Sequence, residues 1–175
     1  MSLTYLNKHF VFKFISISKS KTYISNRYFN YARAMSKTHD PATNTITINP
    51  LDNKHSATII LMHGLGDSAS GWESTADMLA DQMPHVKFIL PTAASRPITL
   101  NMGMSMPGWY DIKSLGADKH LDPCDGIEDS KKIIMELLEK EHVEVGLPYN
   151  RMLLAGFSQG GAMSLYTGLQ VYIYV

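Results

Sequence analysis

The chain has 175 residues, of which 45% are hydrophobic; this length favours one packed domain and is too short to expect two. Its single cysteine, Cys124, excludes an internal disulfide and a cysteine-based zinc site, and favours a reducing compartment. The net charge of zero is the sum of two unlike parts: residues 1–34 hold six basic and no acidic side chains, and the remaining residues are acidic overall. Because the acidic part lacks the clustered cations that bind phosphate, we do not expect it to bind nucleic acid.

Residues 1–34 form a basic N-terminal extension that we expect to be disordered or a targeting segment. The stretch is rich in Ser and Lys and free of acids, as mitochondrial transit peptides are, but it holds only two Arg, which such peptides favour. Its apolar run is broken by Lys13 and is too short to span a membrane. We therefore expect a cytoplasmic protein, with a mitochondrial location as the alternative.

From residue 36 onward, strand and helix patterns alternate. Residues 43–49 (TNTITIN) alternate β-branched and polar side chains, which predicts an edge strand, and the apolar run 57–63 predicts a buried strand. A glycine-containing loop follows. Apolar and small residues recur at helical spacing over 72–83, and 86–91 (VKFILP) predicts a second buried strand.

The second half begins with a long segment, to about residue 124, that has no clear period and that we expect to lie over a functional site. Residues 126–142 predict an amphipathic helix, 151–156 (RMLLAG) a third buried strand, and the residues from Gln159 to about Gln170 a helix. The pattern predicts an α/β fold over residues 36–175: a mostly parallel sheet with helices on both faces.

The junction between the last strand and helix carries Gly156-Phe157-Ser158-Gln159-Gly160. This matches G-x-S-x-G, the nucleophile elbow, in the strand-to-helix position that the motif requires. Glycines are needed on both sides because the strained turn packs tightly against its strand and helix. The alternative is a chance glycine-bounded turn; the context favours Ser158 as a nucleophile at a helix N-terminus.

A second motif, His63-Gly64-Leu65-Gly66, follows the first buried strand. From this position α/β-hydrolases supply one oxyanion-hole donor, and the residue after the nucleophile supplies the other. The predicted donors are the backbone N–H groups of Leu65 and Gln159. His63 precedes the serine, contrary to the order of the triad, so we expect it to shape the loop rather than to act as the base.

Three blocks together resemble the acyl-protein thioesterases, or lysophospholipase-like carboxylesterases: HGLGDSASGW at 63–72, ILPTAASRPITLNMGMSMPGWYDI at 89–112 and AGFSQGGAMSLYTGL at 155–169. The similarity covers roughly residues 45–169. It implies an α/β-hydrolase fold and hydrolysis of thioester-linked fatty acyl groups, chiefly palmitate on protein cysteines. It also implies side activity on lysophospholipids and small esters, with no cofactor or metal.

The middle block suggests an acyl-binding surface made of Met102, Met104, Met106 and Trp109. Flexible Met side chains can adapt their shape to an alkyl chain, although they also serve as general core fillers. A surface of this kind is compatible with transient contact with a membrane. Both interpretations of the Met residues stay open.

No Asp, Glu or His follows Ser158 in the sequence, whereas the triad order places the acid and the base after the nucleophile. The sequence therefore suggests a C-terminally truncated or misjoined family member whose serine lacks a base, unless an upstream histidine such as His120 or His142 substitutes. Two alternative functions stay open: a catalytically dead module that binds acyl chains or a partner protein, and a carboxylesterase of small esters.

Overall fold

A computed structural model describes residues 35–51, 55–116 and 120–171 of the chain. The predicted basic extension, residues 1–34, lies outside the described residues. The elements, in chain order, are β1 (Lys37–Asp40), β2 (Thr45–Ile48), β3 (Ala57–Met62), α1 (Ala69–Gln82), β4 (Val86–Leu90), β5 (Ser95–Ile98), the 3₁₀ helix η1 (Thr99–Asn101), β6 (Met104–Pro107), α2 (Ile127–Val143), the 3₁₀ helix η3 (Tyr149–Arg151), β7 (Met152–Gly156) and α3 (Gln159–Val171).

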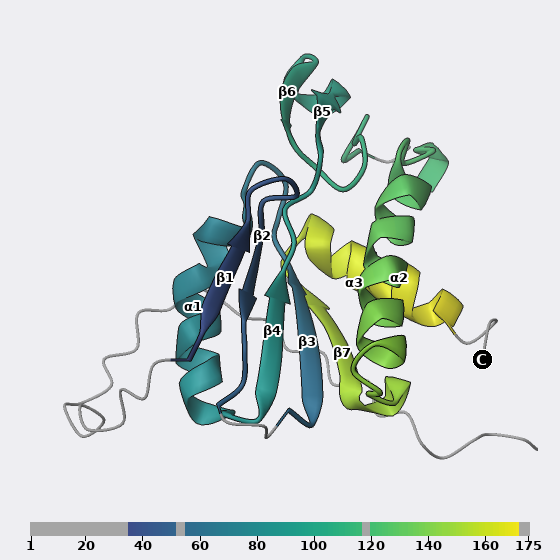
Figure 1. Cartoon of the computed structure of the whole chain (residues 1–175). Coiled ribbons are helices and arrows are strands. Elements are labelled where there is room, and N and C mark those ends of the chain that lie inside the picture. Colours follow the sequence, from purple (N-terminus) through teal and green to yellow (C-terminus); the bar gives the residue numbers. More distant parts are fainter. Residues whose placement is uncertain (1–34, 52–54, 117–119, 172–175) are drawn as a thin grey trace, which may run out of the picture.

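The main sheet has the strand order β1-β2-β4-β3-β7 (Figure 1). Strands β4, β3 and β7 are parallel, and β2 and β1 extend the sheet in antiparallel fashion. The three apolar runs of the sequence thus form the parallel part of the sheet, as predicted. In the register of β3 with β7, Met62 lies opposite Gly156. The loops that follow these two residues consequently start side by side at one end of the sheet.

The prediction that residues 43–49 form an edge strand is wrong in one respect. Strand β2 lies inside the sheet, between β1 and β4, and its Ile46 and Ile48 are buried. The edge is β1, whose four residues, KTHD, are all exposed. Because β1 joins the sheet through backbone pairing and contributes no buried side chain, its sequence carries no hydrophobic pattern to predict it.

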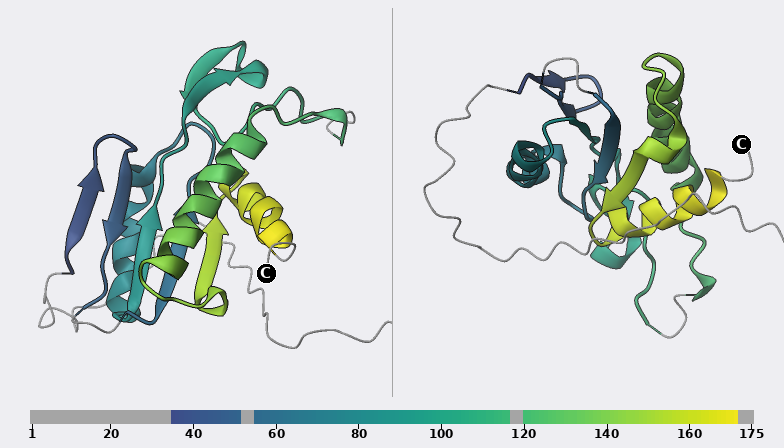
Figure 2. Two further views of the ribbon diagram at one scale, coloured as in Figure 1. Left: turned by 45° about the vertical axis from the view of Figure 1, so that its right-hand side comes forward. Right: turned by 90° about the horizontal axis from the view of Figure 1, so that it is seen from below.

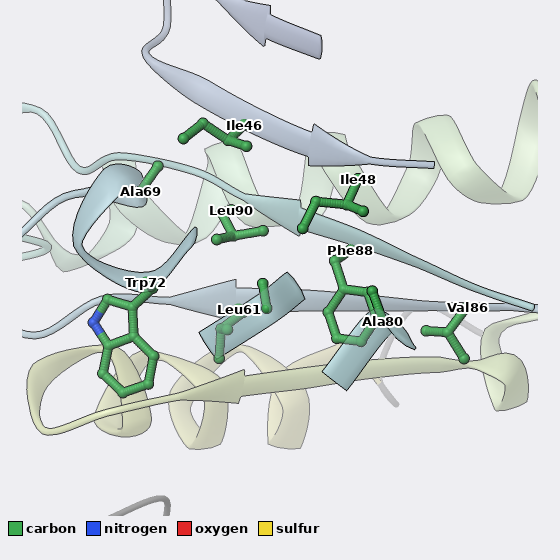
Figure 3. Packing of buried hydrophobic residues seen from close by; sticks show 10 residues of the cluster. Ile46, Ile48, Leu61, Ala69, Trp72, Ala80, Val86, Phe88 and Leu90 are labelled. Carbon is green, nitrogen blue, oxygen red and sulfur yellow. The ribbon is translucent and has the colours of Figure 1, made fainter. Parts of the chain in front are cut away.

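One face of the sheet packs against α1, as the view from below shows (Figure 2, right). The buried residues of this layer come from β2, β3, α1 and β4, and Figure 3 shows how they interdigitate. They are Ile46, Ile48, Leu61, Ala69, Trp72, Ala76, Ala80, Val86, Phe88 and Leu90. Burying a large apolar side chain contributes about 1.5–3 kcal/mol. The predicted stripe of the helix over 72–83 therefore holds α1 against the sheet.

The opposite face packs against α2 and α3. Its buried residues alternate along the strands with those of the first face: Ile60 and Met62 lie here, whereas Leu61 lies on the α1 side. The helices contribute Ile134, Leu138 and Met163. The chain is thus a sheet between two helical layers, the expected α/β arrangement.

The segment after β4, expected to be a loop without regular structure, contains a hairpin. Strands β5 and β6 pair antiparallel, with Ile98 opposite Met104, and the hairpin projects beyond the end of the sheet at which β4 ends (Figure 1). Each strand has four residues and carries a proline, which hides the pattern in the sequence. Among the described helices, none has the length and apolar character needed to cross a membrane.

Candidate active site

Ser158 occupies the turn between β7 and α3. Its φ angle is 51°, in the left-handed region that costs a non-glycine residue about 1–2 kcal/mol. The turn is held by hydrogen bonds from Phe157 N–H to the Met62 carbonyl (3.1 Å) and from Gly160 N–H to the Phe157 carbonyl (2.9 Å). Ser158 is exposed. The structure therefore presents a strained serine to solvent at the N-terminus of a helix.

The two motif glycines lie where no side chain fits. A Cβ on Gly156 would lie 2.4 Å from the Gly160 carbonyl carbon. A Cβ on Gly160 would lie 2.3 Å from the Met62 carbonyl oxygen and 2.5 Å from that of His63. These neighbours are all backbone atoms that cannot move aside. The glycines bring α3 into direct contact with the end of β3, which fixes Ser158 beside the loop that leaves β3.

That loop, residues 63–66, lies against the nucleophile turn. A Cβ on Gly64 would lie 3.5 Å from Ser158 Cβ, and Gly66 has a φ of 76°. Among the described residues, neither the Leu65 N–H nor the Gln159 N–H has a hydrogen-bond acceptor. The structure thus brings together Ser158 and the two segments that carry the predicted oxyanion-hole donors.

His63 is buried, with 1% of its surface exposed. Its Nε2 accepts a hydrogen bond from Ala93 N–H (2.9 Å), which leaves the proton on Nδ1, and Nδ1–H donates to the Gly64 carbonyl (2.7 Å). Burial, the main cause, lowers the pKa of His63. The ring is therefore neutral at pH 7 with a fixed tautomer. It shapes the loop and has no free nitrogen with which to act as a base.

The prediction that Trp109 belongs to an acyl-binding surface is wrong. Trp109 is 1% exposed and packs in the core between the sheet, α2 and α3, so it cannot line an open surface. Met102 and Met104 are 98% and 61% exposed, in the hairpin. Met106 is half-buried, and its Sδ would lie 3.5 Å from a Cβ on Gly66. Of the three Met residues, Met106 is the one placed against the 63–66 loop.

The Gln159 side chain has a role that the sequence did not indicate. It is buried; its Oε1 accepts from Trp109 N–H (2.8 Å), and its Nε2–H donates to the Tyr110 carbonyl (2.7 Å). The motif allows any residue at this position, so its pattern gave no reason to expect a structural side chain. An amide is nevertheless well suited here because it both donates and accepts.

His142 lies far from the nucleophile. It stacks on Tyr149 (4.3 Å between ring centroids), and its Nδ1–H donates to the Leu147 carbonyl. These contacts precede β7, whereas Ser158 follows it, and five residues of strand span about 16 Å. His142 is therefore not a base for Ser158. His120 is exposed, in the segment before α2.

Within the described ranges, no three His, Cys, Asp or Glu side chains are grouped as metal ligands. A sheet with three parallel strands, a serine in left-handed conformation between strand and helix, and a glycine loop from the neighbouring strand together define the α/β-hydrolase class.

Comparison with known proteins is consistent with this class. The chain belongs to the phospholipase/carboxylesterase family, whose model matches residues 43–172. It is 46% identical over 126 residues to acyl-protein thioesterase 1 of Gibberella zeae, a match covering 69% of this chain and 53% of that protein. It is also 46% identical over 114 residues to acyl-protein thioesterase 1 homolog 1 of Dictyostelium discoideum, covering 65% of this chain and 50% of that protein.

Among solved structures, the acyl-protein thioesterase 2 of Zea mays matches with a TM-score of 0.60 and 34% identity, covering 70% of this chain and 49% of that one. The predicted resemblance and the predicted fold are therefore confirmed. The chain spans about half the length of the curated relatives it matches.

Proposed function

We propose that the chain carries the nucleophile and oxyanion-hole half of a serine hydrolase that cleaves fatty acyl thioesters on proteins. The observation that carries this proposal is Ser158 itself: exposed, held at a φ of 51° and flanked by the Gly64 loop. In this role the Ser158 oxygen attacks the acyl carbonyl, the C–S bond breaks, and the cysteine thiol leaves with the hydroxyl proton; water then hydrolyses the acyl-serine ester and releases the fatty acid. The N–H groups of Leu65 and Gln159 stabilise the oxyanion, and each donor is worth roughly 10²–10³ in rate.

The names of the relatives support an acylated protein as substrate. The family description, phospholipase/carboxylesterase, supports phospholipids and carboxylic esters as a class, and we propose lysophospholipids and small esters among them. The exposed Met102 and Met104 of the hairpin suit contact with an alkyl chain or a membrane surface, because Met adapts its shape to irregular apolar partners. The proposed location stays cytoplasmic, with the mitochondrion as the alternative if residues 1–34 act in targeting.

The residues after Ser158 include no acid and no histidine. A serine without a base is a weak nucleophile. We therefore expect slow turnover from a polypeptide of these 175 residues. The expected rate enhancement over the uncatalysed reaction in water is roughly 10³–10⁴-fold, whereas a full triad reaches millions. Ordinary turnover of p-nitrophenyl butyrate would contradict this expectation; if substituting His120 then abolished the turnover, an upstream base would be identified.

The nucleophile is tested with a fluorophosphonate probe at pH 9, followed by intact-mass analysis and peptide mapping. The folded chain should label at Ser158 at least tenfold faster than the same chain in urea, because the two N–H groups are preorganised only in the folded state. Ser158→Ala should not label. Labelling of the folded chain no faster than the unfolded one, or at other serines, would contradict the proposed nucleophile.

The substrate class needs a second measurement. With the label established, competition by palmitoyl thioesters should slow labelling more strongly than competition by short oxyesters. Equal competition by both would favour a carboxylesterase of small esters. Binding of a palmitoylated peptide without any labelling would favour a non-catalytic acyl-binding module.

A further inference from the structure

The segment of residues 107–110, which begins at the last residue of β6, is attached to the nucleophile helix. The Gln159 side chain bonds the backbone of this segment twice, at Trp109 N–H and at the Tyr110 carbonyl. Gln159 is 3% exposed, so these bonds are shielded from water. On a third side the Ser130 hydroxyl of α2 donates to the Trp109 carbonyl. The segment is therefore fixed relative to the start of α3.

The same segment is attached to the loop that leaves β3. Gly66 N–H donates to the Pro107 carbonyl (2.8 Å), and the Trp109 indole N–H donates to the His63 carbonyl (2.8 Å). Gly108 lies between the two attachments: a Cβ there would meet Leu65 Cδ1 at 3.0 Å and Gln159 Oε1 at 3.6 Å. One short stretch of backbone thus touches both residues whose N–H groups are proposed to bind the oxyanion.

We infer that the segment of residues 107–110 sets the spacing between the two oxyanion-hole donors, with the side chains of Gln159 and Trp109 as its positioning groups. The inference rests on the proposed function, because it takes Leu65 and Gln159 as the donors. Physically, the two N–H groups come from separate loops with no direct hydrogen bond between them. The contact of Gly160 with the end of β3 places the two loops side by side, and the bonds that both loops make to residues 107–110 add a second constraint on the separation of the two N–H groups. Preorganised donors are what makes an oxyanion hole effective.

The arrangement differs from ordinary core packing in one respect. A purely structural Trp109 would contribute through its buried ring, and the loss of its N–H bond would weaken the whole fold. A positioning role instead predicts local coupling: a change at Gln159 should reach the Gly66 N–H, which lies in another loop and does not touch the Gln159 side chain directly. The bond of Gly66 N–H to Pro107 makes that amide a reporter.

The experiment measures amide hydrogen exchange by NMR on the full chain as wild type, Gln159→Met and Trp109→Phe. Gln159→Met keeps the length and approximate volume of the side chain and removes both of its hydrogen bonds. Trp109→Phe removes the indole N–H together with part of the buried ring, so Gln159→Met is the cleaner test of the hydrogen bonds. The exchange of Gly66 N–H should accelerate at least tenfold in each variant, while amides in β4 keep their wild-type protection. Gln170→Met is the matched control on the same helix: it loses a side-chain bond to Lys131 and should leave Gly66 unchanged.

Fluorophosphonate labelling at Ser158 supplies the second readout. In Gln159→Met and Trp109→Phe the maximal labelling rate should fall at least tenfold, with the half-saturating probe concentration unchanged. Wild-type exchange at Gly66 in both variants would overturn the inference, as would a uniform acceleration across the sheet. If the wild-type chain itself fails to label, the proposed nucleophile fails, and with it the role assigned to the donors. Accelerated exchange at Gly66 would then stand as a structural coupling alone.

Discussion

The two ends of the parallel sheet are built from different interactions. At the carboxyl end, where β3 and β7 finish, the contacts that hold the Ser158 turn are made by backbone groups and glycines. Ser158 is in a left-handed conformation there, and two N–H groups are left without acceptors within the described chain. His63 is the buried titratable group of this end, and burial lowers its pKa so that it stays neutral. This end keeps strain and open donors.

At the amino end the interactions involve charges and are complete. Glu141 of α2 is 1% exposed; its Oε1 accepts from Lys87 of β4 (2.5 Å) and its Oε2 from the Thr58 hydroxyl of β3 (2.7 Å). His55 adds a bond with the Thr58 hydroxyl (2.8 Å). Every carboxylate oxygen is satisfied. One end of the sheet therefore carries the strained serine and the open donors of the proposed site, whereas the other holds α2 in place.

The largest expected effect comes from filling the carboxyl end. Gly160→Ala places a Cβ 2.3 Å from the Met62 carbonyl oxygen, and only backbone movement of α3 or β3 relieves the overlap. We expect a loss of about 4 kcal/mol or more in the free energy of unfolding, or no folded protein. Urea denaturation followed by circular dichroism measures this change.

Gly161→Ala is the matched control, one residue further along α3. Its Cβ would come no closer than 3.3 Å to another atom, the Gly156 carbonyl oxygen, and alanine favours a helix over glycine by about 1 kcal/mol. Its stability should stay within about 1 kcal/mol of the wild type. Equal losses in the two variants would show that the contact of Gly160 with β3 is not the cause.

The sequence predicted those parts of the fold that bury a periodic apolar face. The runs that became β3, β4 and β7 and the stripe of Trp72, Ala76 and Ala80 are of this kind. It missed β1, which pairs through its backbone only, and the β5–β6 hairpin, whose four-residue strands carry Pro97 and Pro107. The periodicity of apolar residues can be read from one segment of the sequence, whereas the pairing of a strand depends on a second strand elsewhere in the chain.

At the site, the motif placed Ser158 and the glycines at a strand-to-helix turn, because close backbone approach requires glycine. The predicted acyl-binding surface misplaced Trp109, which follows exposed Met residues in the sequence but packs in the core of the folded chain. The motif also gave no indication of the Gln159 side chain. Both errors concern residues whose partners come from distant segments, so no spacing within one segment could reveal them.

An intermediate effect is expected at the amino end. Glu141→Leu leaves the Lys87 ammonium group facing an apolar side chain, and the Lys87 side chain is only 18% exposed. Breaking a buried ion pair costs about 3–5 kcal/mol; because Lys87 retains some access to water, we expect about 2–3 kcal/mol. The double variant Glu141→Leu/Lys87→Met removes both charges and should recover most of that loss. If the double variant is as unstable as Glu141→Leu alone, the loss comes from changed packing and not from the unpaired charge of Lys87. Labelling of Ser158 should be unaffected in any variant that folds.

The smallest effect tests the strain at the carboxyl end and should have the opposite sign. Ser158→Gly removes the cost of a non-glycine residue at a φ of 51° and, since the exposed hydroxyl has no hydrogen bond among the described residues, gives up no contact in exchange. We expect a gain of about 1 kcal/mol in the free energy of unfolding together with complete loss of probe labelling. Met102→Gly is the matched control, because Met102 has a φ of 56° and is 98% exposed, far from any packing that could complicate the result. If Met102→Gly stabilises the chain and Ser158→Gly does not, the serine turn is not strained by its surroundings, and the distinction between the two ends of the sheet loses its energetic basis.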